Sequence, residues 1–305
     1  MKKVGFLYKK IFLKHENPAF HPENEGRLLA ILEGIKNAGL YEKLIHLEPR
    51  KATEEEITRV HDKRYFERIK APGEGYLDPD TYKSEHTFEA ALYAAGASIT
   101  AVEACKDGNI ERSFCAVRPP GHHAERSAAM GFCIFNNVAV GARYAQKIGY
   151  EKVFIVDFDV HHGNGTQHIF EEDDTVFYFS THQYPYYPGT GSEAEKGRGK
   201  GAGFTYNVPM RAGSGDDDYL RVYSGVLPKL ISDFSPNIMF VSSGYDIHQR
   251  DPLAGMSVST EGIRGIVRAI LDSSGGIPVI FSLEGGYNHQ ALSESVAATI
   301  EEMLR

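Results

Sequence analysis

Residues 152–167 read KVFIVDFDVHHGNGTQ and join an apolar run to a cluster of carboxylate and imidazole side chains. The run KVFIVDFD (152–159) is almost continuously apolar, which is typical of a strand buried on both faces of a parallel sheet. Gly163 and Gly165 then mark a sharp turn. The polar cluster therefore stands at the carboxyl end of a buried strand, where α/β proteins bind their ligands.

Five further stretches have the same strand-like character, and helical patterns alternate with them. The other predicted strands are KKVGFLY (2–8), SFCAVRPP (113–120), TVFYFSTH (175–182), NIMFVSSGYD (237–246) and IPVIFSLEGGY (277–287). The predicted helices cover 23–39, 84–107, 136–148, 216–233 and 260–273. In GSGDDDYL (213–220), acids near the positive end of the helix dipole indicate a helix start. Because no linker or repeat interrupts this alternation, we predict one doubly wound α/β domain over residues 1–305.

The overall composition fits an enzyme rather than a nucleic-acid-binding or membrane protein. Hydrophobic residues make up 42% of the 305 residues, which is enough for a sizeable core. The net charge of -8 argues against a nucleic-acid-binding surface and mildly favours cationic substrates. No apolar window is long enough to predict a membrane span, and lysines interrupt the N-terminal apolar run. Cys105, Cys115 and Cys133 form no C-x-x-C pair, which favours a reducing cytoplasm.

The strand end at 157–161 carries the side chains that a divalent metal needs. Side chains alternate along a strand, so Asp157, Asp159 and His161 face one side. Their burial is costly unless something neutralises them, and no lysine or arginine lies within this run. Asp and His donors suit zinc, so we interpret Asp159 and His161 as two ligands of a catalytic site. An ion-pair or hydrogen-bond network is the alternative.

A third ligand should come from another strand end, and SSGYDIHQRDPL (242–253) offers three candidates. Asp246 directly follows the apolar run IMFVSS, whereas His248 and Asp251 lie further along the chain. We favour Asp246 because it is closest to the strand end.

RPPGHH (118–123) places two imidazoles after another predicted strand. Adjacent residues point in different directions, so His122 and His123 are unsuited to binding one metal together. They suit a general base and a general acid near neutral pH, with a solvated surface turn as the alternative. Either Asp157 or Asn164 could orient an imidazole by accepting its Nδ1–H.

SLEGGY (282–287) ends the last predicted strand with a glycine pair that brings Tyr287 to the same edge of the sheet. A phenol there could donate a hydrogen bond to a developing oxyanion; a plain turn is the alternative. Two other kinds of site are disfavoured. KGRGKGAG (196–203) lacks the phosphate-loop pattern and is interpreted as a mobile surface turn, and no G-x-S-x-G motif supports a serine hydrolase.

Together these motifs resemble the histone deacetylase superfamily, which includes acetylpolyamine amidohydrolases and acetoin-utilisation proteins. RPPGHH, DFDVHHGNGTQ, YYPGTG (186–191), NVP (207–209), SGYDIHQRDPL and LEGGY occur in the family's order. HPENEGRL (21–28) and LDPDTY (77–82) are similar to the family's N-terminal part. The resemblance implies an arginase–deacetylase fold, a parallel sheet of about eight strands flanked by helices.

The resemblance also implies two kinds of bound cation. One zinc ion per chain would be held by Asp159, His161 and Asp246, with ferrous iron as the alternative metal. A structural potassium ion would lie beside it, partly on main-chain carbonyls. Its ligands by analogy would be Asp157, Asp159, His161, Ser180 and Thr181.

The catalytic roles implied by the resemblance match the pattern of polar residues. His122 and His123 would carry out acid–base catalysis, with Asp157 orienting His122. Tyr287 would polarise the substrate carbonyl. Asn164 stands where class I members carry an aspartate, and in this respect the chain is similar to class II members.

The family's acyl-lysine channel has two aromatic walls, which the resemblance places at Phe132, after Gly131, and at Tyr187. Leu253 occupies the position where members specialised for polyamines can carry glutamate to meet a second ammonium. Leu253 removes that argument for a polyamine substrate, although other polyamine enzymes place their acidic residue elsewhere. Ordinary packing is the alternative interpretation of Phe132, Tyr187 and Leu253.

The sequence therefore predicts a zinc-dependent deacetylase that releases acetate from an N-acetyl amide of lysine or a related amine. An acetylated polyamine or small metabolite is the alternative substrate, and a non-catalytic acetyl-lysine-binding protein is the rival outside catalysis. An arginase-like two-metal ureohydrolase is disfavoured, because Gly163 and His248 replace carboxylates that a second metal needs. The expected partner is the acetylated amine, without nucleic acid or membrane, and a homo-oligomer is compatible with the sequence.

Overall fold

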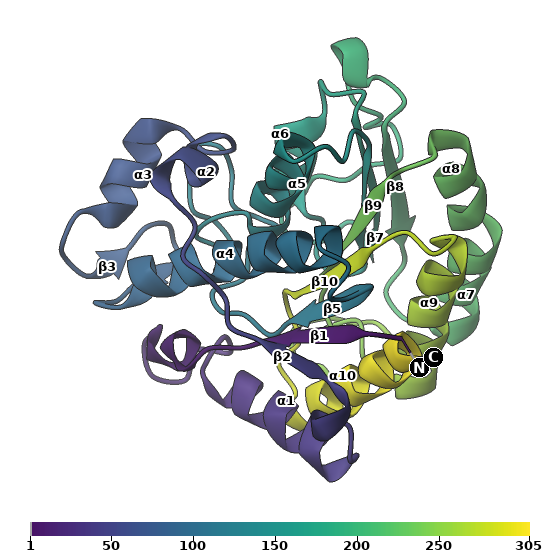
Figure 1. Ribbon diagram of the computed structural model, residues 1–305, viewed down its shortest axis with the longest axis horizontal. Coiled ribbons are helices and arrows are strands. Elements are labelled where there is room, and N and C mark those ends of the chain that lie inside the picture. Colours follow the sequence, from purple (N-terminus) through teal and green to yellow (C-terminus); the bar gives the residue numbers. More distant parts are fainter. Residues whose placement is uncertain (1) are drawn as a thin grey trace.

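Eight strands form one parallel sheet in the computed structural model, which describes residues 2–305 (Figure 1). Their order is β2-β1-β5-β10-β9-β6-β7-β8, and every pairing is parallel. The strands are β1 (Val4–Leu7), β2 (Ile45–Leu47), β5 (Arg112–Cys115), β6 (Val153–Asp157), β7 (Val176–Gln183), β8 (Thr205–Met210), β9 (Ile238–Ser243) and β10 (Val279–Leu283). A separate antiparallel ribbon joins β3 (Gly75–Tyr76) to β4 (Tyr82–Lys83). The predicted α/β class and parallel sheet are confirmed.

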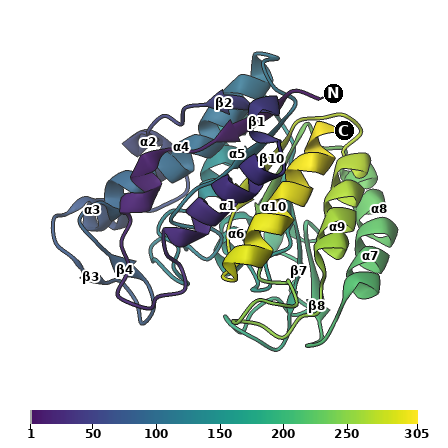
Figure 2. The same ribbon diagram turned by 90° about the horizontal axis from the view of Figure 1, so that it is seen from below.

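Helices cover both faces of this sheet (Figures 1 and 2). One face carries α4 (Thr87–Lys106), α5 (Asn137–Lys147) and α6 (Asn164–Phe170). The other face carries five helices, and each packs on the next in this spatial order: α1 (Gly26–Asn37), α10 (His289–Leu304), α9 (Thr260–Ser273), α7 (Asp216–Gly225) and α8 (Leu227–Phe234). The short helices α2 (Glu54–Thr58) and α3 (Lys63–Lys70) form a pair next to α5. Three 3-10 segments complete the elements: η1 (Lys10–Lys14), η2 (Tyr41–Lys43) and η3 (Gly199–Gly201).

The six strands predicted from the sequence are present, but the two edge strands of the sheet were missed. β2 is only three residues long, and none of its side chains is buried. β8 contains Pro209, and only part of it is buried. Edge strands tolerate proline and solvent exposure, so they lack the apolar run that identifies central strands. The sequence pattern therefore identified only the buried centre of the sheet.

The predicted helix over 216–233 is two helices. α7 ends at Gly225 and α8 begins at Leu227 with Pro228 in its first turn, where the missing proline N–H breaks no helical hydrogen bond. The predicted start of α7 is confirmed, since its first turn is acidic. The helices α2, α3, α6 and α10 were not predicted. Within residues 2–305, no helix has the length and apolar character needed to span a membrane.

The carboxyl ends of the central strands meet where the chain order of the sheet reverses. The chain runs from β5 to β6 across a space that β9 and β10 fill later. The register pairs Asp157 with Ser242 on one side and with Ser180 on the other. The three-dimensional positions of the polar residues after β5, β6, β9 and β10 are therefore fixed by strand pairing.

Candidate active site

Three side chains that the sequence proposed as metal ligands converge beyond β6 and β9. One ligand atom each from Asp159, His161 and Asp246 lies within 4.8 Å of the others. The Nδ1 atom of His161 is 3.1 Å from Oδ1 of Asp159 and 3.2 Å from Oδ2 of Asp246. Both carboxylates are buried, whereas His161 also lines a cavity.

This group of donors fits a divalent cation. Oδ2 of Asp246 is buried and has no hydrogen-bond partner, although Nδ1 of His161 lies 3.2 Å away. Burial and the neighbouring Asp159 raise the pKa of Asp246 to about 7. Burial alone would lower the pKa of His161, but Asp159 and Asp246 raise it to about 10. A cation would satisfy the unpaired oxygen, and one nitrogen with carboxylate oxygens suits zinc or ferrous iron.

Two glycines allow the main chain to approach these carboxylates closely. A Cβ atom at Gly244 would lie 2.0 Å from Oδ2 of Asp159, and one at Gly285 would lie 2.1 Å from Oδ2 of Asp246. The Gly285 N–H donates to Oδ2 of Asp159 at 2.8 Å. Any side chain at position 244 or 285 would therefore displace a proposed ligand.

The other candidates for metal binding have different roles. His248 lies 3.2 Å from Oγ1 of Thr260 through its Nε2 atom, and Asp251 accepts main-chain N–H groups. At Gly163, a Cβ atom would lie 2.3 Å from Oδ2 of Asp157, so a carboxylate there would not fit. The ligands that a second, arginase-like metal requires are thus absent from these positions.

The two histidines of RPPGHH have different partners. Nδ1 of His122 is 3.0 Å from Oδ2 of Asp157, whereas Nδ1 of His123 is 2.7 Å from Oδ1 of Asn164. Nδ2 of Asn164 donates to Oε1 of Glu125 at 2.6 Å, which fixes the orientation of the amide. The structure therefore uses both orienting residues that the sequence left open, one for each ring.

The surroundings of the two rings shift their pKa values in opposite directions. Burial opposes charge on His122, but Asp159 and Asp157 raise its pKa to about 10. For His123, burial and the neighbouring His122 and His161 hold the pKa well below its usual range. Two adjacent titratable groups with opposite shifts are a common arrangement for acid–base catalysis.

Tyr287 reaches the same cavity from the turn after β10. Its N–H donates to Oδ2 of Asp251 at 2.7 Å. Arg27 lies 4.9 Å from the centre of the Tyr287 ring and donates to the carbonyls of Glu284 and Gly286. Burial raises the pKa of Tyr287 well above its usual value, so the phenol keeps its proton and stays a donor.

A cavity of about 210 Å³ connects these groups to the surface. The sequence-predicted residues in its wall are Phe132, Tyr187 and Leu253, together with Gly131. Tyr187 packs edge-on against His123, with 5.3 Å between ring centres. Gly131 has a φ of 55°, and a Cβ atom there would lie 2.4 Å from the His123 ring, so glycine is required.

Comparison with known proteins agrees with this geometry. The family profile described as "Histone deacetylase domain" matches residues 21–303. The chain belongs to the histone deacetylase family. A solved structure titled "Crystal Structure of HDA15 HD domain" superposes with a TM-score of 0.94 at 37% identity, covering 99% of this chain and 88% of that chain. The expected arginase–deacetylase fold is thereby confirmed.

Two curated relatives show how far the family likeness extends. A probable deacetylase of Archaeoglobus fulgidus is 37% identical over 292 residues, covering 93% of this chain and 81% of that protein. The polyamine deacetylase HDAC10 of Homo sapiens is 36% identical over 307 residues, covering 95% of this chain but 45% of that protein. This chain also spans about half the length of several plant relatives. The likeness therefore concerns the deacetylase domain.

The side chains predicted to bind potassium are already engaged. Oγ of Ser180 lies 2.9 Å from Nδ1 of His182, and Oγ1 of Thr181 lies 2.8 Å from the Tyr223 hydroxyl. Asp157 contacts His122. These contacts do not test the predicted ligands, and the potassium site stays a prediction.

Several residues of the site were not assigned a role from the sequence. The cavity wall also includes Asp80, Pro120, Cys133, Tyr186 and Gly285. Glu284 accepts from the main chain of the histidine turn, and Glu125 accepts from the Asn164 amide. Asp80 lies within LDPDTY and Tyr186 within YYPGTG, so both were inside recognised motifs. Glu284 lies within LEGGY, but the motif alone gave it no role, because its contacts are with backbone N–H groups of a distant segment. Glu125 lies outside the quoted motifs.

Proposed function

We propose that the chain is a metal-dependent deacetylase that hydrolyses an N-acetyl amide of lysine or a related amine to acetate and the free amine. One observation carries the proposal. The group Asp159, His161 and Asp246 stands beside the same cavity as two histidines with different partners and a phenol donor. Zinc is the metal we propose, with ferrous iron as the alternative, since the donors fit either.

The bound metal would supply Lewis-acid polarisation of the amide carbonyl and a lowered pKa for water. Asp159, His161 and Asp246 would hold it at the base of the cavity. The Gly285 N–H keeps Asp159 in place through its second oxygen. The proposed metal position is therefore set by β6, β9 and the turn after β10.

His123 is suited to accept a proton from water. The Asn164 oxygen can only accept, so the ring carries its proton on Nδ1 and leaves the Nε2 lone pair free. Glu125 prevents the Asn164 amide from reversing, because it accepts from the Asn164 NH₂ group. His123 thus enters the reaction as a neutral base.

His122 is suited to carry a positive charge next to the reacting amide. The carboxylate of Asp157 accepts from its ring, and the Tyr178 hydroxyl donates to the same carboxylate oxygen at 3.1 Å. Asp157 therefore favours the protonated ring and places a proton within the site for the leaving amine. Tyr287 would donate to the oxyanion as the carbonyl becomes tetrahedral.

The cavity supports an acetylated amine with an extended apolar stem. Phe132 and Tyr187 supply aromatic walls for methylene groups, and Asp80 supplies a carboxylate in the wall. Acetyl-lysine fits this arrangement. An acetylated polyamine is the second candidate, because Asp80 could attract another ammonium even though Leu253 does not.

The test is acetate release by the zinc-loaded chain from an acetyl-lysine peptide, free acetyl-lysine and a monoacetylated polyamine. We expect acetate from at least one of them and its loss in His123→Ala at unchanged metal content. If the fully loaded chain binds these compounds but releases no acetate from any, it is a binding protein and the proposal is wrong.

A further inference from the structure

Glu284 is a buried carboxyl group that the proposed metal site and proton transfers do not use. It directly follows β10, three residues before Tyr287, and it is 0% exposed. Burial raises the pKa of Glu284 to about 7, opposed by His122 and the Gly121 N–H. A group so costly to bury requires an explanation from its contacts.

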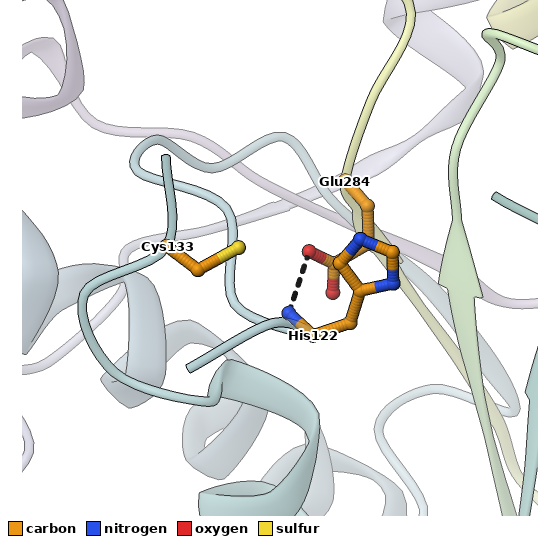
Figure 3. A group of neighbouring side chains, drawn as sticks. All are labelled: His122, Cys133 and Glu284. Carbon is orange, nitrogen blue, oxygen red and sulfur yellow. Dashed lines mark hydrogen bonds between the residues drawn. The ribbon is translucent and has the colours of Figure 1, made fainter. Parts of the chain in front are cut away.

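Its contacts are with the main chain of the histidine turn. Figure 3 shows the Glu284 carboxylate next to His122, with the backbone N–H of His122 directed at it. Oε2 of Glu284 accepts from the N–H of Gly121 at 2.7 Å and from that of His122 at 3.1 Å. Its other oxygen, Oε1, accepts from the Ser242 hydroxyl at 3.3 Å.

The histidine turn needs an acceptor of this kind. Pro119 and Pro120 have no N–H, so the first donors of the turn are the buried Gly121 and His122. A Cβ atom at Gly121 would lie 2.5 Å from the Asn137 nitrogen, so the turn is packed tightly against α5. Glu284 supplies the acceptor that this buried segment requires.

The segment that carries Glu284 also carries the other reactive groups. The next residue, Gly285, donates to the proposed ligand Asp159 at 2.8 Å, and Tyr287 follows on the same turn. Glu284 therefore connects the histidine pair, the metal site and the phenol.

His122, Cys133 and Glu284 place potential ligand atoms within 4.8 Å of one another, but these groups are engaged elsewhere. The Cys133 thiol donates to the Gly131 carbonyl at 3.3 Å, and Nδ1 of His122 contacts Asp157. Oε2 of Glu284 already accepts two N–H groups. The arrangement favours a hydrogen-bond acceptor over a second metal site.

We propose that Glu284 is a positioning residue whose carboxyl oxygens hold the His122–His123 turn in fixed register with Tyr287. Catalysis then depends on the length and acceptor geometry of the side chain rather than on its charge. The inference rests on the proposed deacetylase function and adds a residue to it.

Two substitutions separate geometry from charge. Glu284→Gln keeps the length and an acceptor oxygen for both N–H groups, and its NH₂ group can donate to Ser242. Glu284→Asp keeps the charge but is one methylene too short to reach the turn. We expect kcat for Gln within about threefold of wild type. We expect kcat for Asp to be about 10–100-fold lower, the range found when hydrogen-bond partners that support a metal site are replaced. KM and metal content should change little in either variant.

Amide hydrogen exchange gives a readout that needs no turnover. The Gly121 and His122 amides should stay protected in Glu284→Gln and lose protection in Glu284→Asp. An active Asp variant with an inactive Gln variant would overturn the positioning role, because charge would then be decisive. If Asp does not fold, Gln alone decides, and a more than about tenfold fall in its kcat at full metal content contradicts the proposal. If the wild type is inactive but its Gly121 and His122 amides are protected, the proposed deacetylase function is wrong. The contact between Glu284 and the histidine turn would still hold.

Discussion

The floor of the cavity and its rim are built in different ways. His161 lies on the floor, and its neighbours Asp159 and Asp246 are at most 1% exposed and follow paired central strands. Tyr186 and Tyr187 on the rim are 36% and 38% exposed and lie in a loop. Strand pairing positions the segments that carry the floor residues. The rim can change without altering the sheet. The difference indicates that the floor sets the reaction and the rim sets the choice of substrate.

A few contacts join parts of the rim to one another and to the histidines below. The Tyr186 hydroxyl donates to the Leu253 carbonyl, and its ring stacks on His161 with 5.7 Å between centres. Oγ1 of Thr190 lies 2.7 Å from Nδ1 of His162. Substitutions on the floor should therefore abolish turnover, whereas substitutions on the rim should redistribute it among substrates.

The largest effect is expected for His161→Ala on the floor. Removing a proposed metal ligand should lower kcat/KM by more than about 10³, because groups that act as one unit lose most activity together. His248→Ala, in a histidine that contacts Thr260 instead, is the matched control and should keep bound metal and activity. Assays combined with elemental analysis check both. Equal losses in the two variants would show that His161 is not specifically a ligand.

Tyr287→Phe tests whether the phenol in the cavity wall donates a hydrogen bond to the oxyanion. Loss of one oxyanion donor should lower kcat about 10²–10³-fold with a smaller change in KM. Bound metal should not change, since the phenol is not a proposed ligand, and the Tyr287 N–H contact with Asp251 is kept. Steady-state kinetics on a short acetylated substrate decide the matter. Near-normal turnover with full metal content would make the GGY segment only a turn.

Asn164→Asp tests the hydrogen bond between the Asn164 amide and the Glu125 carboxylate. The new carboxylate would face Oε1 of Glu125, which now accepts from Asn164 at 2.6 Å. We expect the free energy of unfolding to fall by about 1–3 kcal/mol, the cost of a buried polar group without its partner. Adding Glu125→Gln should restore most of it. Urea unfolding of the single and double variants is the measurement; a single variant as stable as wild type would show that this contact carries no weight.

The smallest effect is expected on the rim, for Leu253→Glu. A partly exposed carboxylate should favour an acetylated polyamine over acetyl-lysine by about 1 kcal/mol, or roughly fivefold in the ratio of kcat/KM values. Leu253→Gln has a similar size without charge and should leave that ratio unchanged. If Glu and Gln shift the ratio equally, or neither does, Leu253 does not contact the substrate's second ammonium.

The sequence identified the polar residues at strand ends better than the residues that support them, for a physical reason. Asp159, His161 and Asp246 follow apolar runs, and parallel strands bring such ends together at one edge. Glu284 and Glu125 act through backbone N–H groups or an amide of distant segments, which no pattern of side chains records. The edge strands β2 and β8 were missed because they lack an apolar run. Potassium binding, oligomeric state and a cytoplasmic location stay predictions.

The central claim is that one divalent metal, held by Asp159, His161 and Asp246, is required for deacetylation. The most direct measurement is titration of chelator-treated protein with zinc, and separately with ferrous iron, while acetate release is recorded. Turnover should rise from background, level off at about one equivalent per chain and be absent at every metal concentration in His161→Ala. Full turnover without metal, or a rise that continues to two required equivalents, would contradict the account.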